Sequence, residues 1–209
     1  MRRTGVVGAS QMLAGIYRLK RVCGVAAAAG GLALVFASAG VAGPIADRAA
    51  EAETRSAAGD GGGAVAAFDQ ATDAFWQATP LTLRVATFAD AIIGFGKYTP
   101  RADAAFHAGD TVGIYLEPVG YGFTAEGDSF RVAYGTGIEI RTPGGLILGK
   151  TDDFGTLTWT GRTKSHEVQA AVNVTLPALK PGDYLLLLTL NDQASSKSAT
   201  ATLPFTIAE

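Results

Sequence analysis

Residues that could do chemistry are sparse in this sequence. It has two histidines, His107 and His166, and a single cysteine, Cys23. A hydrolase needs a nucleophile with a base in reach, or paired carboxylates around a cleft, and both histidines lie in polar stretches typical of loops. The sequence contains no G-x-S-x-G, H-E-x-x-H or glycine-rich phosphate loop. It therefore predicts a protein that is not an enzyme and uses no cofactor.

Metal ligands are also few. Cys23 and both methionines lie within the first 23 residues, so a chain that loses this segment lacks the Cys and Met ligands of a blue-copper site. The acidic stretches at 126–128 and 152–153 lack the D-x-D-x-D-G spacing of a calcium loop. Charged turns of this kind keep sheet edges soluble. The expectation is that no metal binds.

The most unusual side chains are aromatic residues flanked by glycine, namely Phe95, Tyr98, Tyr121 and Phe123. Glycine allows tight turns in which the backbone approaches a ligand, and exposed rings stack well on sugars or peptides. These four residues are therefore the candidate ligand-binding residues. The competing interpretation is that the rings fold back over the open ends of a β-sheet core.

The first 39 residues have the layout of a signal peptide. Their five charges are all positive, an uncharged run over 22–43 follows, and Ala37-Ser38-Ala39 matches a cleavage site. Cleavage after Ala39 would leave a chain without cysteine, hence without disulfides, and would change the net charge from −2 to −7. An acidic surface argues against nucleic acid and anionic membranes as partners. The alternative is an uncleaved inner-membrane anchor, because the run is long enough to span a bilayer.

Two short segments separate the predicted signal peptide from the main domain. Residues 40–63 contain mostly Ala, Gly and charged residues, which predicts a flexible linker. Over 64–79, apolar residues recur at spacings of three and four until Pro80, which predicts a short amphipathic helix. Since one short helix is unstable alone, its apolar stripe of Val65, Phe68, Thr72, Phe75 and Trp76 should pack on the domain that follows.

From residue 80 to residue 209 the pattern changes to β-strands. Residues 199–207 alternate apolar side chains with Thr and Pro, and residues 184–190 are apolar on both faces, as in a central strand. Thr142-Pro143-Gly144-Gly145 predicts a type II turn in a hairpin. Seven or eight short strands bounded by Gly, Pro or Asp predict an all-β fold, a single antiparallel immunoglobulin-like β-sandwich of 7–8 strands.

Four segments carry a family resemblance. The run Pro181-Gly182-Asp183-Tyr184 resembles the tyrosine corner of immunoglobulin and fibronectin-like domains, in which the Tyr hydroxyl bonds back to the preceding loop. The run 190–200 resembles the last hairpin of bacterial extracytoplasmic immunoglobulin-like modules, with a D-x-x-S-x-K-S turn. The segments 94–101 and 117–122, after a helix ending in Phe-Trp, resemble uncharacterised exported proteobacterial proteins. These resemblances imply architecture and location, with structural roles for Tyr184, Gly182 and Pro181.

Together these features predict an exported, non-enzymatic binding or structural module of the bacterial cell envelope, in the periplasm or secreted. Its partner would be an envelope protein, a peptide or a polysaccharide. One alternative is an accessory domain of a periplasmic enzyme or transport system. Another is a membrane-tethered domain with an uncleaved N-terminal anchor.

Overall fold

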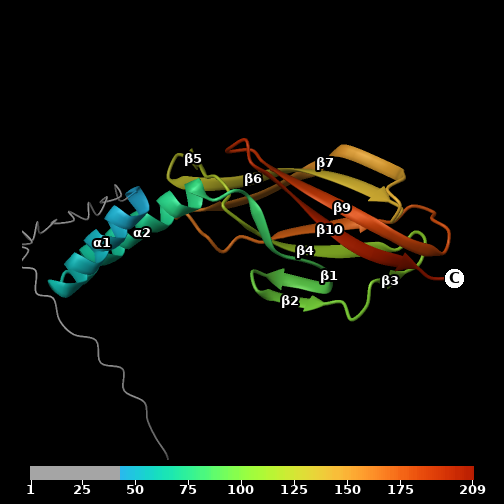
Figure 1. The fold of residues 1–209 in the computed structure, drawn as a ribbon, viewed down its shortest axis with the longest axis horizontal. Helices are drawn as coiled ribbons and strands as arrows, with labels where there is room; N and C mark the ends of the chain where they lie inside the picture. Colours follow the sequence, from blue (N-terminus) through green and yellow to red (C-terminus); the bar gives the residue numbers. More distant parts are fainter. Residues whose placement is uncertain (1–42) are drawn as a thin grey trace, which may run out of the picture. The chain divides into compact units, whose positions relative to one another are not determined.

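The structure is a computed structural model that describes residues 43–209 (Figure 1). The predicted signal peptide, its cleavage site and Cys23 lie outside the described residues. Among the described residues, no helix is both long and apolar enough to cross a membrane.

The described chain contains two helices followed by ten strands (Figure 1). The helices are α1 (Pro44–Ala57) and α2 (Gly61–Ala78). The strands are β1 (Thr82–Gly94), β2 (Lys97–Pro100), β3 (Ala105–Phe106), β4 (Thr111–Val119), β5 (Thr124–Glu126), β6 (Ser129–Arg141), β7 (Ile147–Gly161), β8 (Ala170–Thr175), β9 (Gly182–Asp192) and β10 (Ser198–Ile207).

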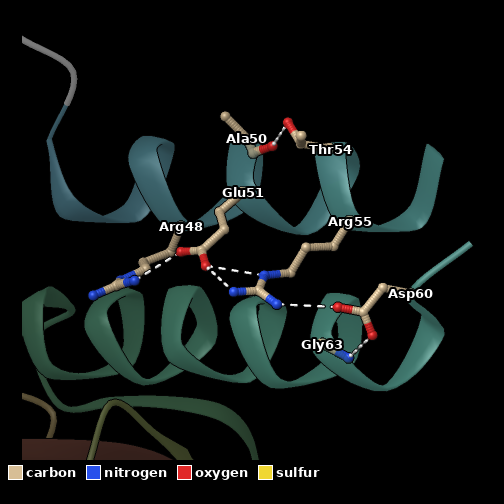
Figure 2. Close-up of polar contacts among 7 residues, drawn as sticks. All are labelled: Arg48, Ala50, Glu51, Thr54, Arg55, Asp60 and Gly63. Atoms are coloured by element: carbon tan, nitrogen blue, oxygen red, sulfur yellow. Dashed lines mark hydrogen bonds and ion pairs between the residues drawn. The ribbon is translucent and has the colours of Figure 1, made fainter. Parts of the chain in front are cut away.

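Helix α1 corrects the sequence prediction, which places a flexible linker over 40–63. Proline at the first helical position and many alanines favour a helix here. Where α1 and α2 meet, Glu51 forms ion pairs with Arg48 and Arg55 at 2.7 and 2.9 Å (Figure 2). The two helices also pack through buried alanines, among them Ala52 and Ala67. Alanine contacts and local ion pairs thus replace the large apolar residues that a packed helix usually shows.

Helix α2 is present as predicted and begins at Gly61, three residues before the predicted start at 64. Its start is fixed by Asp60, whose carboxylate accepts a hydrogen bond from the Gly63 amide at 2.9 Å and pairs with Arg55 at 3.0 Å (Figure 2). This cap offsets the low helix propensity of the glycine run. It also ties the end of α1 to the start of α2.

The strands form two sheets. One has the order β2-β1-β4-β8, and the other has the order β3-β10-β9-β6-β5 with β7 paired to β6. All pairs are antiparallel except β10 with β3. The β-rich prediction is therefore confirmed in its coarse form, while the second helix, the extra short strands and the parallel pair differ from it.

Both sheets contribute to one hydrophobic core. On β9, Leu186, Leu188 and Leu190 have no exposed surface, and β9 lies between β10 and β6 as expected of a central strand. The predicted alternation of 199–207 is confirmed, because Ala201, Leu203, Phe205 and Ile207 are buried while the intervening residues are exposed. Strand β4 faces this core with Val112, Ile114 and Leu116.

The predicted hairpin at 142–145 joins β6 to β7, with a different turn from the one predicted. The Gly145 amide donates to the Thr142 carbonyl at 2.9 Å. The positive φ falls on Gly145, at 92°, and not on Gly144, where a type II turn requires it. The geometry is that of a type I turn followed by a left-handed residue.

Candidate functional site

The four predicted aromatic residues fall into two sets of contacts. Tyr121 and Phe123 lie together, with ring centroids 5.4 Å apart, next to helix α2. Phe95 and Tyr98 lie in the hairpin between β1 and β2, and Tyr98 stacks on Tyr115 of β4 at 3.9 Å. The predicted residues therefore do not form one ligand platform.

Tyr121 is a core residue. It is only 1% exposed, and its hydroxyl donates to the Ser165 carbonyl at 2.7 Å. Trp76, at the end of α2, meets its ring edge-on at 5.1 Å. Burial raises the pKa of the Tyr121 phenol well above its usual range. The ring packs against other side chains of the protein and has almost no surface open to a ligand, as expected if it covers the core.

The same region contains an ion pair and a histidine. Lys164 Nζ lies 2.6 Å from Asp73 Oδ2, and the His166 ring lies 4.3 Å from that of Trp76. Asp73, Lys164 and Tyr121 help to line a cavity of about 70 Å³. Pockets that bind small molecules typically have volumes of about 300–1,000 Å³, so this cavity is too small for a sugar or a peptide.

We expect His166 to make the stability of this contact between α2 and the β-sheet domain depend on pH. Burial lowers the pKa of His166 below 6.5 and neighbouring Lys164 lowers it further, while Asp73 acts in the opposite direction. Below pH ~6.5, His166 therefore binds a proton more readily in the unfolded chain than in the folded chain. The free energy of unfolding is highest above this pH and falls as the pH drops through it. We expect urea unfolding to show this loss between pH 7 and pH 5.

The variant His166→Gln should lose less stability over that pH range than the unaltered chain. His107, with a side chain 72% exposed, offers the matched control. His107→Gln should retain the full decline. An unchanged decline in His166→Gln would contradict the role given to His166.

The D-x-x-S-x-K-S turn also contacts the end of α2. Lys197 Nζ donates to the carbonyls of Gln77, Thr79 and Gly120 at 2.7 to 2.8 Å. The buried Asp192 carboxylate accepts from the Gly122 amide at 2.8 Å, from the Ala194 amide at 3.0 Å and from the Ser195 hydroxyl. These two side chains tie the last hairpin to the end of α2 and to the loop after β4.

Glycine is required in that loop. Gly120 has a φ of 82°, and a Cβ there would lie 2.6 Å from the Pro80 carbonyl oxygen. The segment 117–122 therefore brings its backbone close to the start of β1, with Tyr121 directed into the core.

A second network lies on the face of β4 opposite the core. Tyr115 and Glu117 alternate with the core residues of β4, yet both are buried. The Tyr115 hydroxyl donates to Glu117 at 2.7 Å and accepts from the Gly96 amide at 2.7 Å. Burial, with a smaller effect of Glu117, raises the pKa of Tyr115 to about 12. This hydroxyl joins the 94–101 segment to the 117–122 segment.

Arg84 completes this network. Its guanidinium lies 3.0 Å from the Glu117 carboxylate and 5.4 Å from the centre of the Phe95 ring. Phe95 and Tyr98 are both partly buried. The network holds the hairpin between β1 and β2 against the outer face of the four-stranded sheet.

An open cleft adjoins this hairpin. Strand β1 pairs with β4 as far as Ala89 opposite Gly113, and then, at a register shift between Ala89 and Ala91, it continues with β2 alone. The cleft has a volume of about 570 Å³. It is lined by Ala89, Asp90, Ala91, Ile92, Ile93, Arg101, Phe106, Asp110, Thr111, Val112, Gly113, Gln169, Ala171 and Asn173.

The arginine of the cleft is held in place by several contacts. Arg101 pairs with Asp90 at 3.1 Å, donates to the Ala105 carbonyl at 3.0 Å, and lies 4.5 Å above the Phe106 ring. Gln169 and Asn173 alternate with buried residues on and next to β8, so their side chains point outward. The sequence does not indicate that these amides, Asp90 and Arg101 line a common cleft, and this cleft is the candidate functional site.

The other predicted features have local explanations. Glu126 pairs with Arg131 at 2.7 Å and Asp152 with Lys150 at 3.0 Å. Within residues 43–209, no three His, Cys, Asp or Glu side chains gather closely enough to hold a metal ion. Pro181 and Gly182 lead into β9, and the Tyr184 hydroxyl donates to the Lys180 carbonyl at 2.8 Å.

Comparisons with known proteins assign no family. No protein-family model and no curated protein matches the sequence. Among solved structures, a family 123 glycoside hydrolase from Clostridium perfringens aligns with a TM-score of 0.37 and 13% identity, over 63% of this chain and 28% of that chain. The sporulation control protein Spo0M from Bacillus subtilis aligns with a TM-score of 0.32 and 8% identity, over 63% of this chain and 50% of that chain. The chain thus spans half or less of these neighbours, and similarities this low assign no activity.

Proposed function

We propose that this chain is an exported, non-enzymatic binding module of the bacterial cell envelope, built on an immunoglobulin-like β-sandwich. The signal-peptide pattern of residues 1–39 supports export to the periplasm or beyond. Two sheets around one core, and a Tyr184 hydroxyl that bonds back to Lys180, support the immunoglobulin-like interpretation.

The cleft between β1 and the outer face of β4 and β8 is the observation that carries the binding function. Its polar lining combines two carboxylates, two amides and one arginine, and the arginine is fixed by its partners. Groups of these types hydrogen-bond to hydroxyl and amide groups of a ligand. The ligand that fits this lining best is a glycan of the envelope.

The arrangement of the histidines supports a binding function over catalysis. The His107 side chain is 72% exposed and its Nδ1 is 3.7 Å from Asp110. His166 Nε2 is 3.7 Å from Asp73, beside a cavity of about 70 Å³. Neither histidine lines the cleft of about 570 Å³.

A binding titration tests the proposal. Residues 41–209 form one compact unit and can be titrated with soluble peptidoglycan fragments by calorimetry or NMR. Gln169→Ala removes a hydrogen-bonding amide from the cleft and should weaken binding about fivefold, as expected for about 1 kcal/mol. Gln193→Ala removes an exposed amide from the turn before β10 and serves as the matched control.

Equal binding by the two variants would place the ligand outside the cleft. Binding of an unmodified peptide, but of no glycan, would replace the proposed ligand class and retain the site. The absence of binding to glycans and peptides alike would contradict the proposed function.

A further inference from the structure

The apolar stripe of α2 is largely unpartnered. The sequence predicts that Val65, Phe68, Thr72, Phe75 and Trp76 pack on the β domain, and only Trp76 is buried. Val65, Phe68 and Phe75 are 62%, 60% and 52% exposed. At 100° per residue these three side chains share one face of the helix. Exposed apolar patches of this kind mark interaction sites.

A groove of small residues lies beside this stripe. Its volume is about 620 Å³, and its α1 side is formed mainly by Ala49, Ala52, Ser56 and Ala57. Val65 and Phe68 of α2 form the other side. The face of the helical hairpin formed by α1 and α2 therefore presents a ridge of large side chains next to a groove of small ones.

Half of the charged residues of the hairpin form one network that does not line the groove. Its members are Arg48, Glu51, Arg55 and Asp60 (Figure 2). Glu53 is the one charged residue that lines the groove. Pairing through the groove face therefore leaves the charged network in water.

We propose that the groove face binds the same face of a second copy of this chain, giving a symmetric four-helix contact. In a two-fold pair each surface meets itself, so the ridge of Val65 and Phe68 enters the alanine-lined groove of the partner. Knobs that enter holes are the ordinary packing of antiparallel helices.

The size of the face suits this occupant. An 18-residue helix is about 27 Å long and a pair of helices about 20 Å wide, so two such faces remove roughly 1,000 Å² from solvent. This area is at the lower end for a specific interface, so we expect a dissociation constant on the order of 10 μM.

The charge of the hairpin disfavours a lipid surface as the occupant. Residues 44–79 hold six Asp and Glu against two Arg. Helices that lie on anionic membranes carry Lys and Arg on their polar face.

Sedimentation of residues 41–209 provides the first test. The unaltered unit should form dimers at micromolar concentration, and Phe68→Glu should weaken the dimer about tenfold or more. Gln70 is exposed on another face of α2, so Gln70→Glu adds the same charge and should change the dissociation constant less than about twofold. Unchanged circular dichroism in both variants would show that the monomers fold. A monomer at 100 μM (about ten times the expected constant), or equal weakening by the two variants, would overturn the proposal.

A photo-crosslinking phenylalanine analogue at position 68 of the full chain provides the second test. An adduct of twice the chain mass, with both crosslinked peptides from residues 44–79, is the expected result. Placed at position 70, the same analogue should give no such adduct. A crosslink to residues 1–42 of the same chain, to lipid or to another protein would overturn the proposal, since each identifies a different occupant.

Discussion

Replacing Asp192 with alanine is expected to remove about 3–5 kcal/mol from the free energy of unfolding. The Asp192 carboxylate is 4% exposed and accepts hydrogen bonds from two backbone amides and the Ser195 hydroxyl. Removing one partner of a buried charged network leaves the other groups without their bonds, which costs far more than the net value of one hydrogen bond. Against a typical total of about 5–15 kcal/mol, this loss is large. Urea unfolding followed by circular dichroism measures it.

Asp183→Ala is the matched control. Asp183 is exposed and accepts from the Thr206 hydroxyl at 2.8 Å, and an exposed polar contact contributes less than about 1 kcal/mol. Asp192→Asn should have a stability between those of the two alanine variants, because the amide oxygen of Asn can still accept some of these hydrogen bonds. Equal stabilities of Asp192→Ala and Asp183→Ala would show that the buried network adds little.

The sequence predicts the strands better than it predicts what joins them. The alternation over 199–207 is visible because β10 buries one face and exposes the other. The sequence does not predict helix α1, because the side of α1 that packs on α2 consists of alanine. Large apolar residues are the usual sign of a packed helix face. The α2 stripe is recognised correctly, but periodicity alone does not identify what the stripe contacts.

The candidate cleft is harder to predict because it depends on backbone irregularity. Asp90, Gln169 and Asn173 are ordinary polar residues in the sequence, and they line one cleft because β1 leaves β4 after Ala89. The roles of Asp192 and Lys197 likewise depend on long-range contacts. Lys197 binds the Gln77 carbonyl 120 residues away, so the turn motif indicates a hairpin without indicating what its side chains hold.

Trp76→Ala is also expected to lower the free energy of unfolding by about 3–5 kcal/mol. Unlike the loss of Asp192, it should affect the helical hairpin more than the sheets. Trp76 is 9% exposed and contacts the rings of Tyr121 and His166, whereas the other large apolar residues of the α2 stripe are exposed. Its loss should release the helical hairpin and leave the core around Leu186, Leu188 and Leu190 intact.

Hydrogen exchange measured by peptide distinguishes this local release from global unfolding. Amides of α2 should lose nearly all their protection in Trp76→Ala, while amides of β9 should stay strongly protected and lose no more than the drop in global stability, because local opening exposes only the segment that has lost its contacts. Phe75→Ala removes the neighbouring aromatic ring, which is 52% exposed, and should leave both segments protected. If α2 keeps the same residual protection as β9 in Trp76→Ala, the hairpin and the sheets form a single cooperative unit, and the Trp76 contact contributes to the stability of the whole domain.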